Sequence, residues 1–207
     1  MGEKSRVQAT VPAGEQGTDK RVRPDAQRSL DALVKAAKEV FATSGVDAPV
    51  REIADKAGVG IGTLYRHFPQ RADLIAAVFR HEVDACAAWA PALAAAHPPR
   101  QALELWIERY IDFLGTKRGL AAALHSNDPA YAGLPPHRNG RLIPALKQLL
   151  DAAESSGDIR PGVEAFDLLN AVGSLYMNVR DEPGAATARR MVALLMDGLR
   201  YGARPAC

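Results

Sequence analysis

Cysteine is scarce in this sequence, which contains only Cys86 and Cys207. Two cysteines, one of them the last residue, do not form the disulfide framework of a small secreted domain, so we expect a cytoplasmic location. Long apolar runs are also absent, because no stretch reaches the roughly 18 residues that a membrane-spanning helix needs. Residues 1–23 have no apolar centre and therefore do not form a secretory signal.

Patterns that carry enzyme chemistry are missing as well. The sequence has no Ser/His/Asp arrangement, and its five histidines lack metal-ligand spacing. The glycine-rich run 58–62 superficially matches a dinucleotide-binding loop, but such a loop follows a strand and needs a further glycine where Thr63 stands. We therefore expect no catalytic residues, no metal site and no cofactor.

Charge is distributed unevenly along the chain. The formal net charge is only +2, yet residues 20–71 hold 10 Lys and Arg against 6 Asp and Glu. Residues 72–207 hold 14 basic residues against 15 acidic ones. A basic excess confined to one short segment is typical of a module that binds a polyanion such as nucleic acid, although a few solvated lysines produce the same imbalance.

Apolar residues recur at helical spacing through most of the chain, and no stretch alternates with the period of a strand. Leu30, Leu33, Val34, Ala37 and Val40 form the first such stripe. Glycines and prolines fall between the stripes, so we predict an all-α fold of about nine helices. The predicted helices cover residues 30–41, 50–57, 61–68, 74–89, 103–114, 120–125, 142–153, 166–179 and 188–201, with a turn-rich loop at 127–136.

The second and third predicted helices have the spacing of a helix-turn-helix. Gly58 supplies a turn conformation that a side chain would oppose, and Val59 fills the space between the helices. In this motif the second helix enters the DNA major groove, which is about 12 Å wide, while the first crosses the phosphates. We therefore predict a DNA-binding head over residues 24–70, an effector-binding and dimerisation domain over 71–207, and a flexible arm over 1–23. At the end of the arm, Lys20, Arg21 and Arg23 either enter the minor groove or contact nothing.

Candidate DNA contacts lie on these two helices and just after them. Glycines at the start of the second helix let its backbone approach the bases, hydroxyl groups can bind phosphates, and a histidine can reach a base edge or a phosphate. An arginine on the first helix can read guanine, and one after the motif can hold a phosphate. The alternative for Tyr65 is that its ring packs inside the head. The alternative for Arg51 is that it is a solvated charge on the surface of its helix. The candidate DNA-binding residues are Arg51, Gly60, Gly62, Thr63, Tyr65, His67 and Arg71.

The motif resembles the TetR (tetracycline-repressor) family of bacterial regulators. The matching residues are Val50-Arg51-Glu52-Ile53-Ala54, Ala57-Gly58-Val59, Gly62-Thr63-Leu64-Tyr65-Arg66-His67-Phe68, Arg71 and Leu74. The resemblance implies a homodimer, bound to a palindromic DNA operator and released by a small-molecule effector. It also implies that the matching arginine, threonine, tyrosine, histidine and basic residue contact DNA. Ala48-Pro49 stands where the family often has a capping Ser or Thr, so we expect Asp47 to cap the first helix of the motif.

The C-terminal part contains candidate effector and dimer residues. Aromatic and polar groups gathered inside a helical bundle are typical of a small-molecule pocket, although aromatic residues also fill ordinary cores. The candidate effector-binding residues are Trp106, Tyr110, Phe113, His125 and Tyr176. The last two predicted helices have more apolar surface than one core contact needs, which predicts a dimer interface. The residues that widen this surface are Met191, Val192, Leu194, Leu195, Met196 and Leu199.

Three functions are consistent with these features. The first is a ligand-controlled repressor, in which an effector favours one spacing of the two heads and so weakens operator binding. An all-α enzyme with a vestigial head would need paired carboxylates facing a pocket, for which the helix 103–114 offers Glu104, Glu108 and Asp112. An architectural DNA binder without an effector would have a filled C-terminal core.

Overall fold

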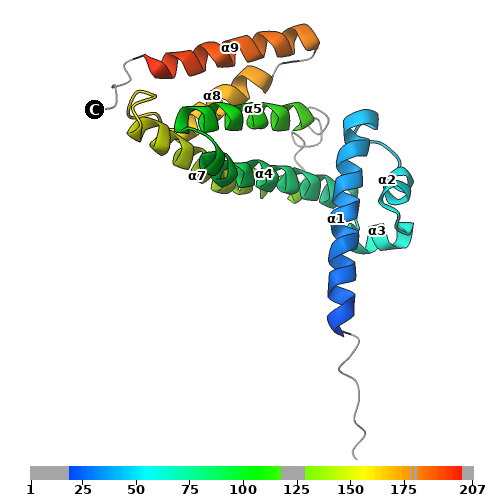
Figure 1. Ribbon diagram of the computed structural model, residues 1–207. Helices are drawn as coiled ribbons and strands as arrows, with labels where there is room; N and C mark the ends of the chain where they lie inside the picture. Colours follow the sequence, from blue (N-terminus) through cyan, green and yellow to red (C-terminus); the bar gives the residue numbers. More distant parts are fainter. Residues whose placement is uncertain (1–18, 118–128, 178, 180, 202–207) are drawn as a thin grey trace, which may run out of the picture.

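The computed structural model describes residues 19–117, 129–177, 179 and 181–201. These residues form helices and no strand, so the predicted all-α fold is confirmed (Figure 1). The α-helices are α1 (Asp19–Ser44), α2 (Val50–Ala57), α3 (Ile61–His67), α4 (Arg71–Ala96), α5 (Pro99–Lys117), α7 (Leu134–Ser155), α8 (Ala165–Met177) and α9 (Glu182–Arg200). A short 3-10 helix, η2 (Pro129–Tyr131), precedes α7. Within these residues no helix combines the length and the apolar character needed to cross a membrane.

The helices α1, α2 and α3 form a small unit at one end of the molecule, which we call the head. In Figure 1, α2 and α3 lie on the side of α1 that faces away from the remaining helices. Short helices such as these are held by burial of one face rather than by helix propensity. The buried residues that join them are Leu33, Ala37, Val40 and Phe41 of α1, Ile53 and Ala54 of α2, Leu64 of α3, and Phe68.

The helix α1 begins earlier than the sequence pattern predicts. Residues 19–23, which we assigned to a flexible arm, are helical, whereas residues 1–18 lie outside the described part of the chain. The N-terminal turns of α1 extend past α3 (Figure 1). The helix ends at Ser44, beyond the predicted end at residue 41, and Gly45 after it adopts a left-handed conformation with φ 79°.

The helix α4 connects the head to the C-terminal helices. Its first turns pack against α1, and its later turns pack against α5 and α7. We predicted that this helix ends before Pro91, but it continues to Ala96 with Pro91 inside. Ala90 and Leu93, on either side of the proline, are buried, and this packing holds the helix together where propensity alone would break it.

Two C-terminal helices also begin earlier than predicted, for one shared reason. The helix α7 starts at Leu134, inside the segment that we predicted as a loop, with prolines in its first turn. The helix α9 starts at Glu182, six residues before the predicted start, and Pro183 follows at once. Proline suits the first helical turn, where the backbone N–H has no partner within the helix. The predicted helix 120–125 lies outside the described residues.

Candidate functional site

The turn between α2 and α3 has the geometry that the helix-turn-helix requires. Gly58 is left-handed, with φ 68°, and its N–H donates to the carbonyls of Ala54 and Asp55. The N–H of Val59 also donates to the Ala54 carbonyl, at 3.1 Å. These bonds satisfy the last carbonyls of α2 and turn the chain sharply into α3. Val59 packs in a half-buried position against the core, as predicted.

The helix α3 has one buried face and one exposed face. Leu64 on α3, with Phe68 just after it, anchors the buried side. On the other side Gly60, Gly62 and Tyr65 are exposed, and the Tyr65 side chain is 51% exposed, so it does not pack inside the head. Thr63 and His67 are half-buried at the edges of this face. The sequence-predicted residues of α3 therefore share one accessible surface.

Two arginines widen this surface. Arg51 of α2 is exposed, as a base-reading or phosphate-binding side chain must be. Arg66 of α3 is exposed as well, although the candidate set chosen from the sequence did not include it. The signal for Arg66 was available, because a basic residue beside Tyr65 falls on the side of the helix opposite the apolar stripe.

The two glycines of α3 are not required by the fold. Gly60 has φ −67°, which any residue adopts, and neither it nor Gly62 has a positive φ. A Cβ atom built at Gly60 or Gly62 would meet no atom of the protein within 4 Å. Gly60 is the N-cap residue of α3, a position where glycine is common. Gly62 lies inside the helix, where glycine lowers stability without a local reason, so its presence points to something outside the chain that approaches the helix closely.

Arg71 makes a bond that its sequence position does not reveal. Its Nη1 donates to the backbone carbonyl of Val46, in the loop between α1 and α2. The side chain is half-buried and joins the start of α4 to the head. The guanidinium group has five N–H donors, so this bond leaves others available for a phosphate.

The cap of α2 differs from the prediction. We expected the Asp47 side chain to cap this helix, but the N-cap residue is Pro49 and no side chain bonds to the helix start. Asp47 lies two residues before the N-cap and is exposed, so its carboxylate is outside the capping position. The N-terminus of α2 therefore keeps free N–H groups, which are suitable donors for a phosphate.

The predicted effector residues that the structure describes lie together in the core of the C-terminal helices. Trp106 and Tyr110 are 0% exposed and stack with ring centroids 5.8 Å apart. The Trp106 Nε1 donates to the Cys86 carbonyl at 3.0 Å, and the Tyr110 hydroxyl donates to the Leu169 carbonyl at 3.3 Å. Burial raises the pKa of Tyr110 to about 12. Trp106 and Tyr110 are therefore packed core residues whose polar atoms are bonded to the backbone of neighbouring helices.

Two of the other predicted effector residues are packed in the same core. Phe113 stacks on Tyr110 at 6.0 Å, and Tyr176 is buried. His125 lies outside the described residues. Cys86 is buried beside these rings, and burial together with the Glu82 charge raises the pKa of its thiol to about 12. The thiol therefore stays protonated and unreactive at neutral pH.

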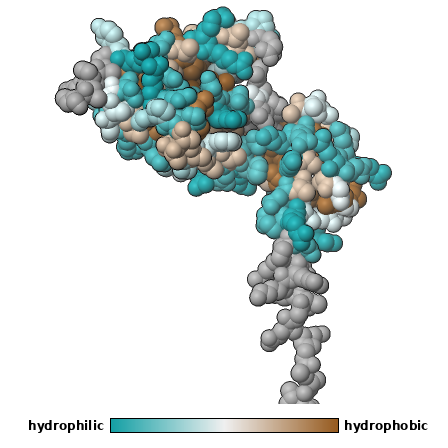
Figure 2. Space-filling view, in the orientation of Figure 1, coloured by the Kyte–Doolittle hydropathy of each residue, from teal (hydrophilic) through white to brown (hydrophobic). Residues whose placement is uncertain are grey.

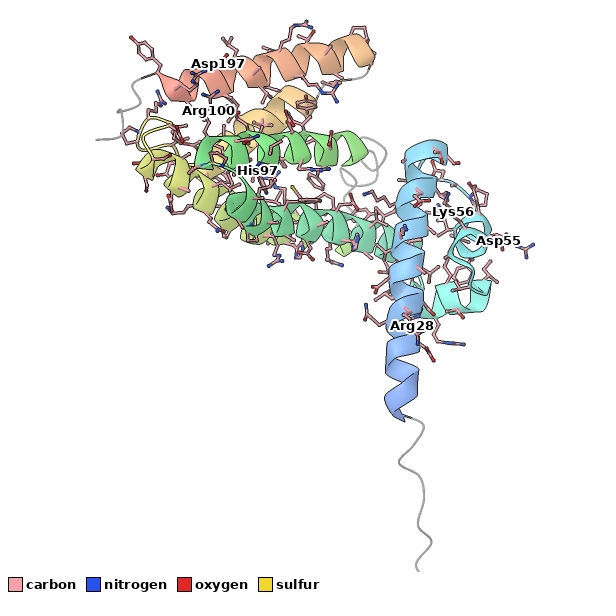
Figure 3. The ribbon with its side chains drawn as sticks, in the orientation of Figure 1. Arg28, Asp55, Lys56, His97, Arg100 and Asp197 are labelled. Atoms are coloured by element: carbon pink, nitrogen blue, oxygen red, sulfur yellow. The ribbon has the colours of Figure 1, made fainter. Side chains whose placement is uncertain are left out.

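An open groove of about 460 Å³ lies between α5 and α9. Its floor is apolar, formed by Ile107, Ile111, Val192 and Met196. Its rim is charged. Three carboxylates come from α5, where the sequence predicts them on one helix, and one carboxylate and one arginine come from α9. At one end Arg100 of α5 bonds to Glu104 at 2.7 Å, and Asp197 of α9 lies above Arg100 (Figure 3). The charged rim residues are Glu104, Glu108, Asp112, Arg189 and Asp197.

The outer side of α8 and α9 leaves apolar side chains in solvent. Met191 is 50% exposed and Leu194 is 73% exposed, while Phe166 of α8 is 49% exposed. In Figure 2, brown apolar side chains interrupt the hydrophilic surface over α9. A second groove, of about 520 Å³, follows this side and is lined chiefly by Ala171, Leu175, Met191, Leu194, Leu195 and Gly198. We call these six residues with Phe166 the α8–α9 face.

The sequence assigned Val192 and Leu199 to the dimer surface, but Val192 faces the groove between α5 and α9, and Leu199 lies at the inner edge of the second groove. Both are buried in the core of their own chain, at 3% and 5% exposure. The apolar residues of α9 therefore divide into an inner set that fixes the helix and an outer set that the chain does not cover. The outer set accounts for the apolar surface that exceeds what one core contact needs.

Comparison with known proteins identifies the same parts of the chain. Residues 33–78 match the family described as bacterial regulatory proteins, tetR family. Residues 98–201 match the family described as transcriptional regulator SbtR-like, C-terminal domain. The chain is 36% identical over 105 residues to the HTH-type transcriptional activator FasR of Mycolicibacterium smegmatis, a match that covers 50% of this chain and 47% of FasR. The chain thus spans about half the length of this curated relative.

Solved structures extend the likeness to nearly the whole fold. The TetR transcriptional regulator SCO0520 of Streptomyces coelicolor is 37% identical, with a TM-score of 0.70, covering 83% of this chain and 98% of that one. A TetR regulatory protein of Mycobacterium vanbaalenii is 31% identical, with a TM-score of 0.66, covering 86% and 99%. With the helix-turn-helix geometry and both family matches in place, this chain belongs to the TetR family of bacterial transcriptional regulators.

Proposed function

We propose that the chain acts as a homodimer that binds a palindromic DNA operator and is released from it by a small-molecule effector, as a repressor. The observation that carries this proposal is the exposed side of α3, where Gly62, a helical glycine without a structural role, stands beside hydroxyl, imidazole and guanidinium groups. Glycines allow the backbone to approach DNA, and these side chains are donors and acceptors for base edges and phosphates.

The dimer follows from the α8–α9 face in the same proposal. One head fills one major groove, whereas an operator with two half-sites needs two heads about 34 Å apart. Joining two α8–α9 faces would bury the apolar side chains of both copies and place both heads on one side of the duplex. The division proposed for this arrangement is a head over residues 24–70, extended by the first turn of α1 from Asp19, and a domain over 71–207 that begins with α4.

Base readout is proposed for Arg51 and His67. Replacing either with alanine should cost about 1–3 kcal/mol of specific affinity, because each removes a hydrogen-bond donor from a base edge. The measurement is fluorescence anisotropy on the operator obtained by selection from random duplex DNA, beside an unrelated duplex. Arg190→Ala is a control of equal charge change, since Arg190 is exposed on α9 and donates to Thr187 of the same helix. If both head variants bind the operator as tightly as the parent, the assignment of base readout is wrong.

Phosphate contact is proposed for Arg71 and Tyr65. Arg71→Ala should weaken binding to operator and unrelated DNA nearly equally, and lower the slope of log affinity against log salt by about one unit. Because Arg71 also bonds to Val46, its thermal unfolding must be followed in parallel. Tyr65→Phe removes only a hydroxyl from an exposed ring and should show the same uniform loss without a change in stability. If the salt slope of Arg71→Ala is unchanged, Arg71 does not contact a phosphate, and its role is the bond to Val46.

The effector site is proposed along α5. Trp106, Tyr110, Phe113 and Tyr176 remain candidates, but an effector reaching them must displace packed rings. The groove between α5 and α9 offers ready volume beside the same helix, within the range of about 300–1,000 Å³ that small-molecule sites occupy. An effector seated there would contact α9 and so act on the helix that carries the proposed dimer face.

The two other functions fit less well. The carboxylates that an enzyme would use do line the groove, but Glu104 is paired with Arg100 and Glu108 is exposed to solvent. General acid–base catalysis requires carboxyl groups held away from bulk water, which this open rim does not provide. An architectural DNA binder would have no use for the groove between α5 and α9.

A further inference from the structure

One ion pair joins the head to the helix that leads away from it. The Lys38 Nζ of α1 lies 2.7 Å from the Glu82 Oε2 of α4. Glu82 is 9% exposed and is the one charged residue in the buried set of the described chain. Glu39, the next residue of α1, makes a pair that stays inside the head: its carboxylate lies 3.0 Å from the Lys56 Nζ of α2, and both side chains are almost half exposed.

The position of Glu82 along α4 places the pair at the joint between the two parts of the molecule. Phe79, one turn earlier, already contacts the Phe113 ring of α5, with centroids 5.8 Å apart. Cys86, one turn later, accepts the Trp106 hydrogen bond. Lys38 therefore reaches from the head to the level at which α4 enters the C-terminal core.

A small polar cavity of about 160 Å³ surrounds this pair. Lys38 and Glu82 line one side, and Arg109 and Asp112 of α5 line the other. Asp112 lines both the groove between α5 and α9 and the cavity that Lys38 and Glu82 line.

An ion pair and an apolar contact constrain this joint differently. The other buried residues of α1 and α4 are apolar and belong to one core, and apolar burial has no directional preference. Glu82 is buried, whereas the Lys38 side chain is 41% exposed and reaches the carboxylate from the edge of the joint. The pair adds little net stability, because desolvation of the carboxylate offsets the attraction, and the attraction repays that cost only in a good geometry. Such a pair is therefore suited to fix an angle between two helices rather than to hold them together.

We propose that the Lys38–Glu82 ion pair sets the angle between the head and the C-terminal domain, and with it the distance between the two recognition helices of the dimer. Lys38 and Glu82 are positioning residues in this account, since neither needs to contact DNA. The inference rests on the proposed function, because head spacing matters only for an operator with two half-sites. An effector that moves α5 would act on this pair through Asp112 and Arg109.

The test measures affinity for a series of operators whose half-sites are separated by zero, one or two added or removed base pairs, with a single half-site as reference. Lys38→Met should weaken binding to the natural spacing by roughly tenfold, a typical size for coupling between sites, and flatten the preference across the series. Affinity for the single half-site should change less than about twofold, because the head itself is intact. Glu39→Gln, which breaks the pair inside the head, should leave the spacing preference unchanged.

A double variant separates positioning from simple stabilisation. Lys38→Met leaves the Glu82 carboxylate buried without a partner and should lower the melting temperature. Lys38→Met/Glu82→Met replaces the pair by an apolar contact and should restore the melting temperature, while the spacing preference stays flat. A double variant with the spacing preference of the parent would overturn the proposal. A parent protein that shows no operator in the selection would instead overturn the proposed function.

Discussion

Leu194→Glu is expected to separate the dimer and to weaken operator binding by about 10²- to 10⁴-fold, the gain that two linked binding modules provide. Leu194 is 73% exposed on α9 and projects from the α8–α9 face. In a dimer each copy would place one carboxylate into or beside a desolvated two-fold contact, which is costly for both. In the monomer the same carboxylate stays in water. Light scattering after gel filtration gives the mass, and anisotropy gives the affinity.

The fold of the single chain should survive this substitution. Ala188, Val192 and Leu199 anchor α9 to its own core and are untouched, whereas Leu195, which the sequence suggests equally, is partly buried against that core. Ala186→Glu is the matched control, because Ala186 is exposed on α9 and lies outside the α8–α9 face. Circular dichroism should show native helix content for both variants. A Leu194→Glu protein that remains dimeric and binds the operator normally would place the interface elsewhere.

Gly62→Leu is expected to lower operator affinity to the non-specific level, a loss of roughly a thousandfold or more, while the protein becomes slightly more stable. A side chain at Gly62 meets no protein atom within 4 Å, so it projects into the space that DNA would occupy. Replacing an exposed helical glycine gains about 0.5–1 kcal/mol. For a chain of this size that corresponds to a rise of about 1–4 °C in the melting temperature.

Gly140→Leu provides the comparison for Gly62→Leu. Gly140 lies in α7, is exposed, and also has no neighbour within 4 Å of a Cβ atom. It should show the same gain in stability with no effect on DNA binding. Normal operator binding by Gly62→Leu would mean that α3 does not enter the groove, whatever the stability change.

The sequence predicts the head better than the rest of the chain, for a physical reason. Leu64 and Phe68 lie one helical turn apart, so their spacing defines the buried side of α3 and, by exclusion, the exposed side. Gly58 has a local cause in its positive φ. Features that depend on neighbours in sequence are visible in a linear pattern.

Features that depend on distant partners are not visible in this way. The bond from Arg71 to Val46 and the pair between Lys38 and Glu82 join residues far apart in the chain. A proline in the sequence does not by itself show where a helix ends, for a related reason. Pro91 lies inside α4, because tertiary packing holds that helix together. An aromatic stripe such as Trp106 and Tyr110 has the same spacing whether it fills a core or lines a pocket, and only the packing decides.

Selection of bound sequences from random duplex DNA with the purified protein shows whether the chain binds an operator as a dimer. The account predicts an inverted repeat whose two half-sites are centred one helical turn, or a multiple of it, apart, since two α3 helices must enter major grooves on one side of the duplex. The Leu194→Glu protein, selected in parallel, should enrich no paired half-sites. Enrichment of an unpaired motif by the parent, or of no motif at all, would contradict a dimeric operator-binding regulator.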